Sequence, residues 1–264
     1  ERVSGVRAVL TWQRIPQIRW GHEIKDQTAL ATDRVRFAGE EVAAVAAEDE
    51  EAAMEAIGRI RVDYEILDPV LSIDGALEES APVLHESSPD NVVRRMTFLR
   101  GEPEKEFKKA AAVYENTFET SMQHHAYMEP IGTLAEVDPS GKVTLHAPVQ
   151  NIFPARDRVA EALDTHSSRV RIIQPVVGGA FGGKMVDEPN TVIAALLART
   201  SGRPVFLNNS RLEEFRGSRP RVPYRIRLRL GASSDGTLTA KEAFIQGDAG
   251  AYSGRTQKVL SVTC

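Results

Sequence analysis

Residues 178–184, with the sequence GGAFGGK, are of types that can bind an anion or a cofactor through the backbone. The four glycines allow positive φ angles and carry no Cβ atoms, so a ligand can approach the chain closely. Successive N–H groups in such a loop form a nest for oxygen-rich or negatively charged groups. The loop follows the apolar run 171–177, which is typical of a β-strand.

Two other interpretations of this loop compete with cofactor binding. Gly178, Gly183 and Lys184 satisfy most of the nucleotide-loop pattern G-x-x-x-x-G-K-[ST], but Met185 stands where a hydroxyl should hold Mg²⁺. Alternatively, the glycines serve only tight packing between a strand and a helix. Glycine content by itself favours packing and binding about equally.

A second motif, HHAYMEP, occupies residues 124–130. His125 and Glu129 are four residues apart and could bind zinc from one face of a helix. However, Pro130 ends any such helix, and no third cluster of ligands lies near it in the sequence. A structural role for the histidines is therefore favoured over a metal site.

A third motif, APVQN, occupies residues 147–151 and contains the amide side chains of Gln150 and Asn151. A Gln-Asn pair beside prolines is usually a polar turn. In isolation this segment indicates no chemistry.

Short strands and helices must position these motifs. Strands at 6–10, 41–47 and 60–66 with a helix at 49–59 predict an α/β unit over residues 1–68. Residues 69–101 read as an irregular connector. Further on we expect strands at 114–120, 132–137, 142–146, 169–177 and 224–230, and helices at 154–164 and from about residue 189.

Composition excludes several classes of protein. The 264 residues carry a net charge of −4, so nucleic acid and anionic membranes are not expected partners, and Arg225, Arg227 and Arg229 are expected to be hydrated or to meet a partner subunit. No apolar run approaches the length of a membrane span. Cys264, the one cysteine, fits a reducing, cytoplasmic location. The first residues resemble the interior of a larger protein.

Taken in order, the three motifs resemble the large, molybdopterin-binding subunit of the molybdenum hydroxylases, the family of xanthine dehydrogenase, aldehyde oxidase, carbon monoxide dehydrogenase and 4-hydroxybenzoyl-CoA reductase. The resemblance implies an α+β or α/β fold. It places a hammerhead-like α/β domain at 1–68, a connector at 69–101 and the first part of the molybdopterin-binding domain at 102–264.

The same resemblance implies a molybdopterin cofactor, in its cytosine dinucleotide form, that oxidises a substrate with oxygen derived from water. Electrons would pass to [2Fe–2S] clusters and FAD, held by partner subunits or by segments outside this chain. Gln150 would donate a hydrogen bond to an oxo ligand of molybdenum, and Phe181 and Met185 would line the substrate pocket. The backbone that holds the cofactor would be that of Gly179, Ala180, Phe181, Gly182 and Gly183.

Two departures from the family limit the expected activity. Xanthine-oxidising members carry a glutamate directly after the loop lysine, whereas Met185 stands here, so an aromatic, N-heterocyclic, aldehyde or acyl-CoA substrate is favoured over a purine. The family's catalytic glutamate is expected beyond Cys264, so no catalytic residue is assigned in this chain. We therefore expect the chain to be inactive without the remaining half of the subunit; the alternative is a non-enzymatic scaffold of the same fold.

Overall fold

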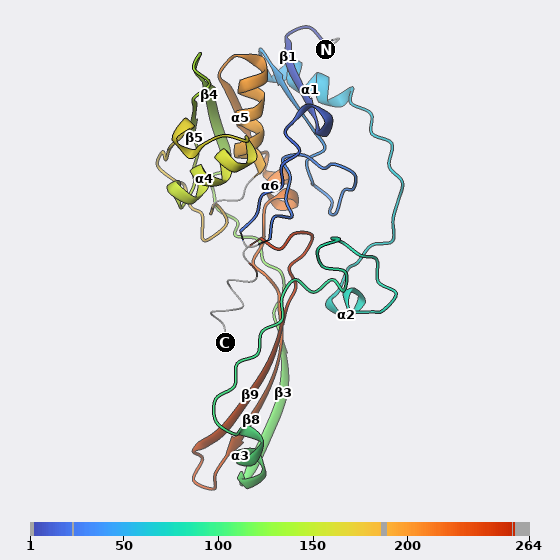
Figure 1. The fold of residues 1–264 in the computed structure, drawn as a ribbon, viewed down its shortest axis with the longest axis vertical. Coiled ribbons are helices and arrows are strands. Elements are labelled where there is room, and N and C mark those ends of the chain that lie inside the picture. Colours follow the sequence, from blue (N-terminus) through green and yellow to red (C-terminus); the bar gives the residue numbers. More distant parts are fainter. Residues whose placement is uncertain (1–2, 23, 186–188, 255, 257–264) are drawn as a thin grey trace. The chain divides into compact units, whose positions relative to one another are not determined.

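The computed structural model describes residues 3–22, 24–185, 189–254 and 256 (Figure 1). These residues form two compact units, each built from two stretches of sequence. Unit 1 contains residues 1–66 and 124–220, and unit 2 contains residues 67–123 and 221–264. Cys264 lies outside the described residues.

The N-terminal part of unit 1 is a two-stranded antiparallel sheet with one helix. Strands β1 (Val6–Thr11) and β2 (Ala43–Ala47) pair, and α1 (Glu50–Gly58) follows β2. The Asp49 side chain caps α1 by accepting a hydrogen bond from the N–H of Ala52 at 2.8 Å. The two strands and the helix predicted in these positions are confirmed, with β2 beginning two residues later than expected.

The third strand predicted at residues 60–66 is wrong. The segment belongs to no sheet among the described residues, and the side chains of Tyr64 and Ile66 are 61% and 94% exposed. Alternating apolar residues satisfy the pattern of a strand, but a strand also needs a neighbouring edge that pairs with its N–H and C=O groups. Residues 60–66 pair with no strand in the described part of the chain.

A four-stranded sheet forms the other layer of unit 1. Its order is β6 (Val170–Ile173), β5 (Val143–His146), β4 (Gly132–Val137) and β7 (Val205–Asn208). β4 and β5 form the predicted antiparallel hairpin, and its turn at 138–141 closes with a 2.8 Å hydrogen bond from Gly141 N–H to the carbonyl of Asp138. β5 and β6 are parallel and are connected through α4 (Ile152–Ala162) and a short 3-10 turn.

Two elements around this sheet differ in length from the prediction. The helix expected at 154–164 begins at Ile152, because Pro154 falls in the first turn, where its missing N–H has no helical partner. The strand expected at 169–177 ends at Ile173. Pro175 cannot donate a ladder hydrogen bond, so the chain leaves the sheet before the glycine loop.

Helix α5 (Pro189–Ser201) is the centre of the core of unit 1, as its apolar spacing predicted. All of its residues from 190 to 198 are buried. It packs against β4 and β7 and also against β1 and β2, so Leu10 and Leu145 belong to one hydrophobic cluster. Residues 1–66 thus share a core with 124–220, and the domain limits 1–68, 69–101 and 102–264 remain a prediction.

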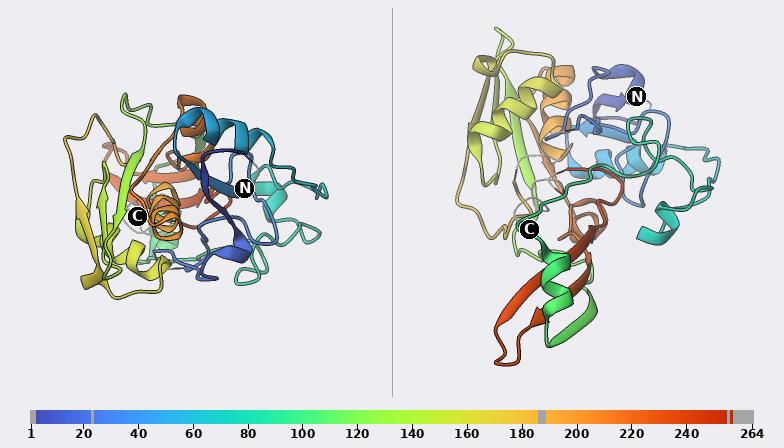
Figure 2. Two further views of the ribbon diagram at one scale, coloured as in Figure 1. Left: turned by 90° about the horizontal axis from the view of Figure 1, so that it is seen from above. Right: turned by 60° about the horizontal axis from the view of Figure 1, so that its bottom comes forward.

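Unit 2 is an antiparallel sheet in the order β3 (Ala112–Glu119), β8 (Tyr224–Ala232) and β9 (Leu238–Gly247). The strands predicted at 114–120 and 224–230 are confirmed. Helix α3 (Pro103–Lys109) lies across one face of the sheet, as Figure 2 shows, and a Cβ atom on Gly231 would stand 3.1 Å from the Phe107 ring. A short helix, α2 (Ile73–Ala76), precedes it.

The predicted basic face of β8 carries acidic partners. Arg225 pairs with Asp74 at 2.6 Å and with Glu119 at 2.8 Å, and Arg229 lies 3.5 Å from both Glu104 and Glu242. These arginines therefore belong to a ladder of alternating charge. Separately, no helix in the described residues is both long and apolar enough to cross a membrane.

Candidate functional site

The glycine loop has an unusual backbone because three of its residues have positive φ angles. These are Gly179 at +93°, Phe181 at +51° and Gly182 at +94°. A phenylalanine rarely adopts this region, and such conformations are found where the surrounding structure imposes them, often at functional sites. The loop therefore turns repeatedly and leaves the Phe181 side chain 75% exposed.

The HHAYMEP segment packs against this loop. A Cβ atom on Gly178 would stand 2.6 Å from Cβ of Glu129, and one on Gly183 would stand 2.8 Å from the Tyr127 ring and 3.0 Å from Nδ1 of His125. Gly178 and Gly183 thus permit close approach. Two of the motifs found in the sequence are therefore in contact in the fold.

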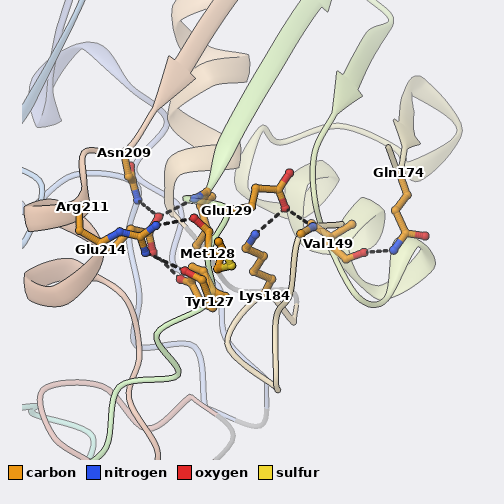
Figure 3. Close-up of polar contacts among 11 residues, drawn as sticks. Tyr127, Met128, Glu129, Val149, Gln174, Lys184, Asn209, Arg211 and Glu214 are labelled. Atoms are coloured by element: carbon orange, nitrogen blue, oxygen red, sulfur yellow. Dashed lines mark hydrogen bonds and ion pairs between the residues drawn. The ribbon is translucent and has the colours of Figure 1, made fainter. Parts of the chain in front are cut away.

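Glu129 joins the two ends of the loop. One carboxylate oxygen, Oε2, accepts the N–H of Gly178 at 2.8 Å and the ammonium of Lys184 at 2.7 Å (Figure 3). The Lys184 side chain is 1% exposed, and its ammonium also lies 4.6 Å from the centre of the Tyr127 ring. The cation is therefore buried on the inner side of the loop.

The third motif is attached to the same loop through Gln150. The side-chain oxygen of Gln150 accepts a hydrogen bond from the N–H of Gly182 at 3.1 Å. The backbone N–H of Gln150 donates to the carbonyl of Lys184 at 2.7 Å. The preceding carbonyl, that of Val149, accepts the Gln174 amide at 2.6 Å. The side-chain nitrogen of Gln150 has no hydrogen-bond partner among the described residues, so it is available as a donor.

The backbone of the loop offers further donors. The N–H groups of Gly179, Ala180 and Phe181 make no hydrogen bond to another described residue. With the Gln150 amide, they form a set of neutral donors next to two glycines of positive φ. Such a set fits an oxygen-rich, anionic group such as a pterin cofactor and its metal-bound oxygens.

Met185 differs in position from the other candidate residues. Its side chain is half-buried and packs against the hydrophobic core, and its sulfur lies 3.8 Å from the amide nitrogen of Asn151. The structure therefore shows Met185 as a packing residue. Its assignment to the substrate pocket remains a prediction.

A second group of residues supports the HHAYMEP segment from helix α6 (Arg211–Gly217), which sequence reasoning did not predict. Glu214, with 0% exposure, accepts hydrogen bonds from the Tyr127 hydroxyl, from the N–H of Ile131 at 2.5 Å and from the Asn209 amide at 3.2 Å. Arg211 donates to the carbonyls of Tyr127 and Met128. The one available signal was Ser210-x-x-Glu213, which forms a capping box at the start of α6.

The geometry argues against the two alternative chemistries. In a nucleotide loop the lysine reaches the phosphates, whereas Lys184 is buried against Glu129 and Tyr127. Within the described residues, no three metal-ligating side chains converge. Burial, and then the neighbouring His124, lower the pKa of His125, and His124 bonds the Ser218 hydroxyl at 2.8 Å. Both histidines therefore fit the structural role expected for them.

Family models match both parts of the chain. Residues 1–68 match the "Aldehyde oxidase and xanthine dehydrogenase, a/b hammerhead domain", and residues 84–264 match the "Molybdopterin cofactor-binding domain". The two matched models are those of a hammerhead domain followed by a molybdopterin-binding domain. The chain belongs to the molybdenum hydroxylase family, in the region of its large subunit, which confirms the family and the fold class predicted from the sequence.

Individual relatives support the same assignment. A probable xanthine dehydrogenase component of Bacillus subtilis is 39% identical over 96% of this chain and 34% of its own length. The nicotinate dehydrogenase large molybdopterin subunit of Eubacterium barkeri is 34% identical over 98% of this chain and 60% of its own length. The chain thus spans between a third and two thirds of these relatives.

Among solved structures, quinoline 2-oxidoreductase from Pseudomonas putida 86 superposes with a TM-score of 0.82 and 28% identity. The match covers 92% of this chain and 32% of that one.

Proposed function

We propose that this chain is part of a molybdenum-dependent oxidoreductase and holds molybdopterin against the outer side of loop 178–184. The observation that supports this most strongly is the set of available donors at Gly179, Ala180, Phe181 and the Gln150 amide. When bound, the cofactor supplies the oxidation of a substrate C–H bond with oxygen derived from water.

The residues of the chain orient that group and cover one side of it. The N–H of Gly182 holds the side-chain oxygen of Gln150 and so fixes the plane of its amide. The amide nitrogen of Gln150 then donates to an oxygen ligand of the metal without adding charge. The backbone of residues 179–183 binds the cofactor edge, and the exposed Phe181 ring limits access of water. We assign no catalytic base to a described residue.

The proposed substrate is an aromatic, N-heterocyclic, aldehyde or acyl-CoA compound. The nicotinate dehydrogenase relative and the quinoline 2-oxidoreductase structure support an N-heterocycle. Because Met185 cannot make a charge-assisted contact, a purine is disfavoured, although the Bacillus relative is named a probable xanthine dehydrogenase.

The remaining components of the enzyme are also proposals. They are the cytosine dinucleotide form of the cofactor, the rest of the molybdenum subunit, and partner subunits that carry [2Fe–2S] clusters and FAD. Nucleic acid and membranes are not proposed partners, since the arginines of β8 have acidic neighbours. We also propose a cytoplasmic location.

The test compares the native complex with a Gln150→Ala complex on N-heterocyclic and aldehyde substrates. Loss of one oriented donor should lower kcat about 100-fold to 1,000-fold, while a Gln13→Ala control on the exposed surface keeps full activity. Undiminished activity of Gln150→Ala at normal molybdenum content would remove Gln150 from the site.

A further inference from the structure

We infer that Glu129 is the positioning residue of the cofactor loop, through a charge pair with buried Lys184 that keeps the loop closed. This inference rests on the proposed function of the loop. It goes beyond that function because Glu129 holds the donors of the loop in place when no ligand is bound.

A single oxygen atom connects both ends of the loop. Oε2 of Glu129 accepts from Gly178 and from Lys184, at distances of 2.8 and 2.7 Å. Between these ends, Gln150 bonds the N–H of Gly182 and the carbonyl of Lys184. The donors of residues 179–181 therefore lie between fixed points, and their direction depends on these contacts.

Burial makes the charge of Glu129 necessary. Lys184 is 1% exposed, so its ammonium has lost almost all contact with water and needs a counter-charge, whereas Glu129 remains 34% exposed. The Tyr127 ring, at 4.6 Å, stabilises the cation further but does not neutralise it. If Glu129 were neutral, Lys184 would regain hydration only by moving outward, and the loop would open with it.

The backbone on both sides of Glu129 is anchored independently. Arg211 holds the carbonyls of Tyr127 and Met128, and Glu214 accepts the N–H of Ile131 (Figure 3). Glu129 is thus presented from a segment attached to α6. Helix α6 therefore fixes this segment, and Glu129 in turn fixes the loop.

The test uses the isosteric variant Glu129→Gln in the full native complex, with Glu136→Gln on the exposed surface of β4 as the matched control. Because loss of a charge-assisted bond releases the loop, exchange of the hydrogen-bonded N–H groups of Gly178, Gly182 and Gly183 should become about tenfold faster or more. Molybdenum occupancy should fall in parallel. Exchange in β4 and β5 should stay unchanged.

A second variant separates charge from general damage. Glu129→Gln combined with Lys184→Met removes both charges, and because neutral replacements of a buried pair are tolerated, it should recover most of the loop protection lost in the single variant. Unchanged loop exchange in Glu129→Gln, or no recovery in the double variant, would overturn the inference. The exchange comparison is made after the cofactor has been removed from each complex, so absence of molybdenum from the native wild-type complex would instead contradict the proposed function.

Discussion

The glycines of GGAFGGK have two separate structural roles. Gly179 and Gly182 have φ angles near +90°, and Gly178 and Gly183 leave no room for a Cβ atom against residues 125–129. The motif is dense in glycine because the loop must turn outward while its two ends remain packed. Packing and binding, which the sequence left as alternatives, are both supported, by different glycines.

Gly183→Ala should lower the free energy of unfolding by about 1–3 kcal/mol, because the new methyl group overlaps buried neighbours. The Tyr127 ring would lie 2.8 Å from it. The control is Gly58→Ala at the end of α1, where a Cβ atom would meet nothing within 4 Å and helix propensity favours alanine. Urea unfolding of both variants measures the difference, and equal effects would contradict the packing role of Gly183.

Glu41 makes stability depend on pH. Burial, followed by repulsion from Glu40 and Glu213, raises its pKa from 4.5 to about 7. A raised pKa in the folded state means that this group's stabilising contribution is present below pH 4.5 and is lost as the pH rises through 7.

Glu41→Gln, which is neutral throughout, should therefore gain stability relative to the wild type as the pH rises from 4 to 8, by about 1–3 kcal/mol at the upper end. Thermal unfolding of both proteins across this range measures the effect. A difference in Tm that is independent of pH would show that Glu41 ionises normally in the fold.

At the scale of elements, helix α6 links the site to the sheet. It follows β7 directly, and its buried Glu214 holds Tyr127, Ile131 and Asn209. A fully buried carboxylate in a helix of seven residues is explained by these bonds and not by packing. The helix therefore stabilises the segment that carries Glu129.

Glu214→Leu should reduce the free energy of unfolding by about 2–5 kcal/mol, because the Ile131 N–H and the Tyr127 hydroxyl lose a buried acceptor. Leu212→Ala, on the same helix and 58% exposed in the wild type, should change it by less than about 0.5 kcal/mol. Chemical denaturation distinguishes the two. A mild effect of Glu214→Leu would mean that α6 does not hold the segment.

Local patterns predicted most elements, and the failures have physical causes. The hairpin of β4 and β5, the core helix α5 and strand β8 follow from periodicity and turn residues. The segment 60–66 has the pattern of a strand without a partner edge, and Pro175 ends β6 early. Helix α6 was missed because its one buried residue, Glu214, is bound by polar groups distant in the sequence, which short-range periodicity does not reveal.

The motifs named segments that the structure brings into contact, but not the contacts between them. Motif order brought Gln150, the glycine loop and the HHAYMEP segment together as parts of one family site. That Glu129 would pair with Lys184, 55 residues away, could not be read from either motif. Spacing within the second motif even suggested a shared zinc site for His125 and Glu129, because helical spacing says nothing about a partner on another loop.

At the scale of the whole molecule, the chain presents its proposed cofactor surface openly. Phe181 is 75% exposed, and Gln150 and Gly182 are exposed as well. Tight binding of a large cofactor requires burial from several sides. We therefore expect the purified 264-residue chain to retain far less molybdenum than the native complex that contains it.

The most direct test of cofactor binding by loop 178–184 is the molybdenum and pterin content of the native complex, compared between the wild type and Gly182→Val. The control is Gly236→Val, because Gly236 also has a positive φ but lies in the turn between β8 and β9, with nothing within 4 Å of its Cβ position. We predict stoichiometric molybdenum in the wild type and in Gly236→Val, and loss of both molybdenum and pterin from an assembled Gly182→Val complex. Full occupancy in Gly182→Val, or a wild-type complex without molybdenum, would contradict cofactor binding by this loop.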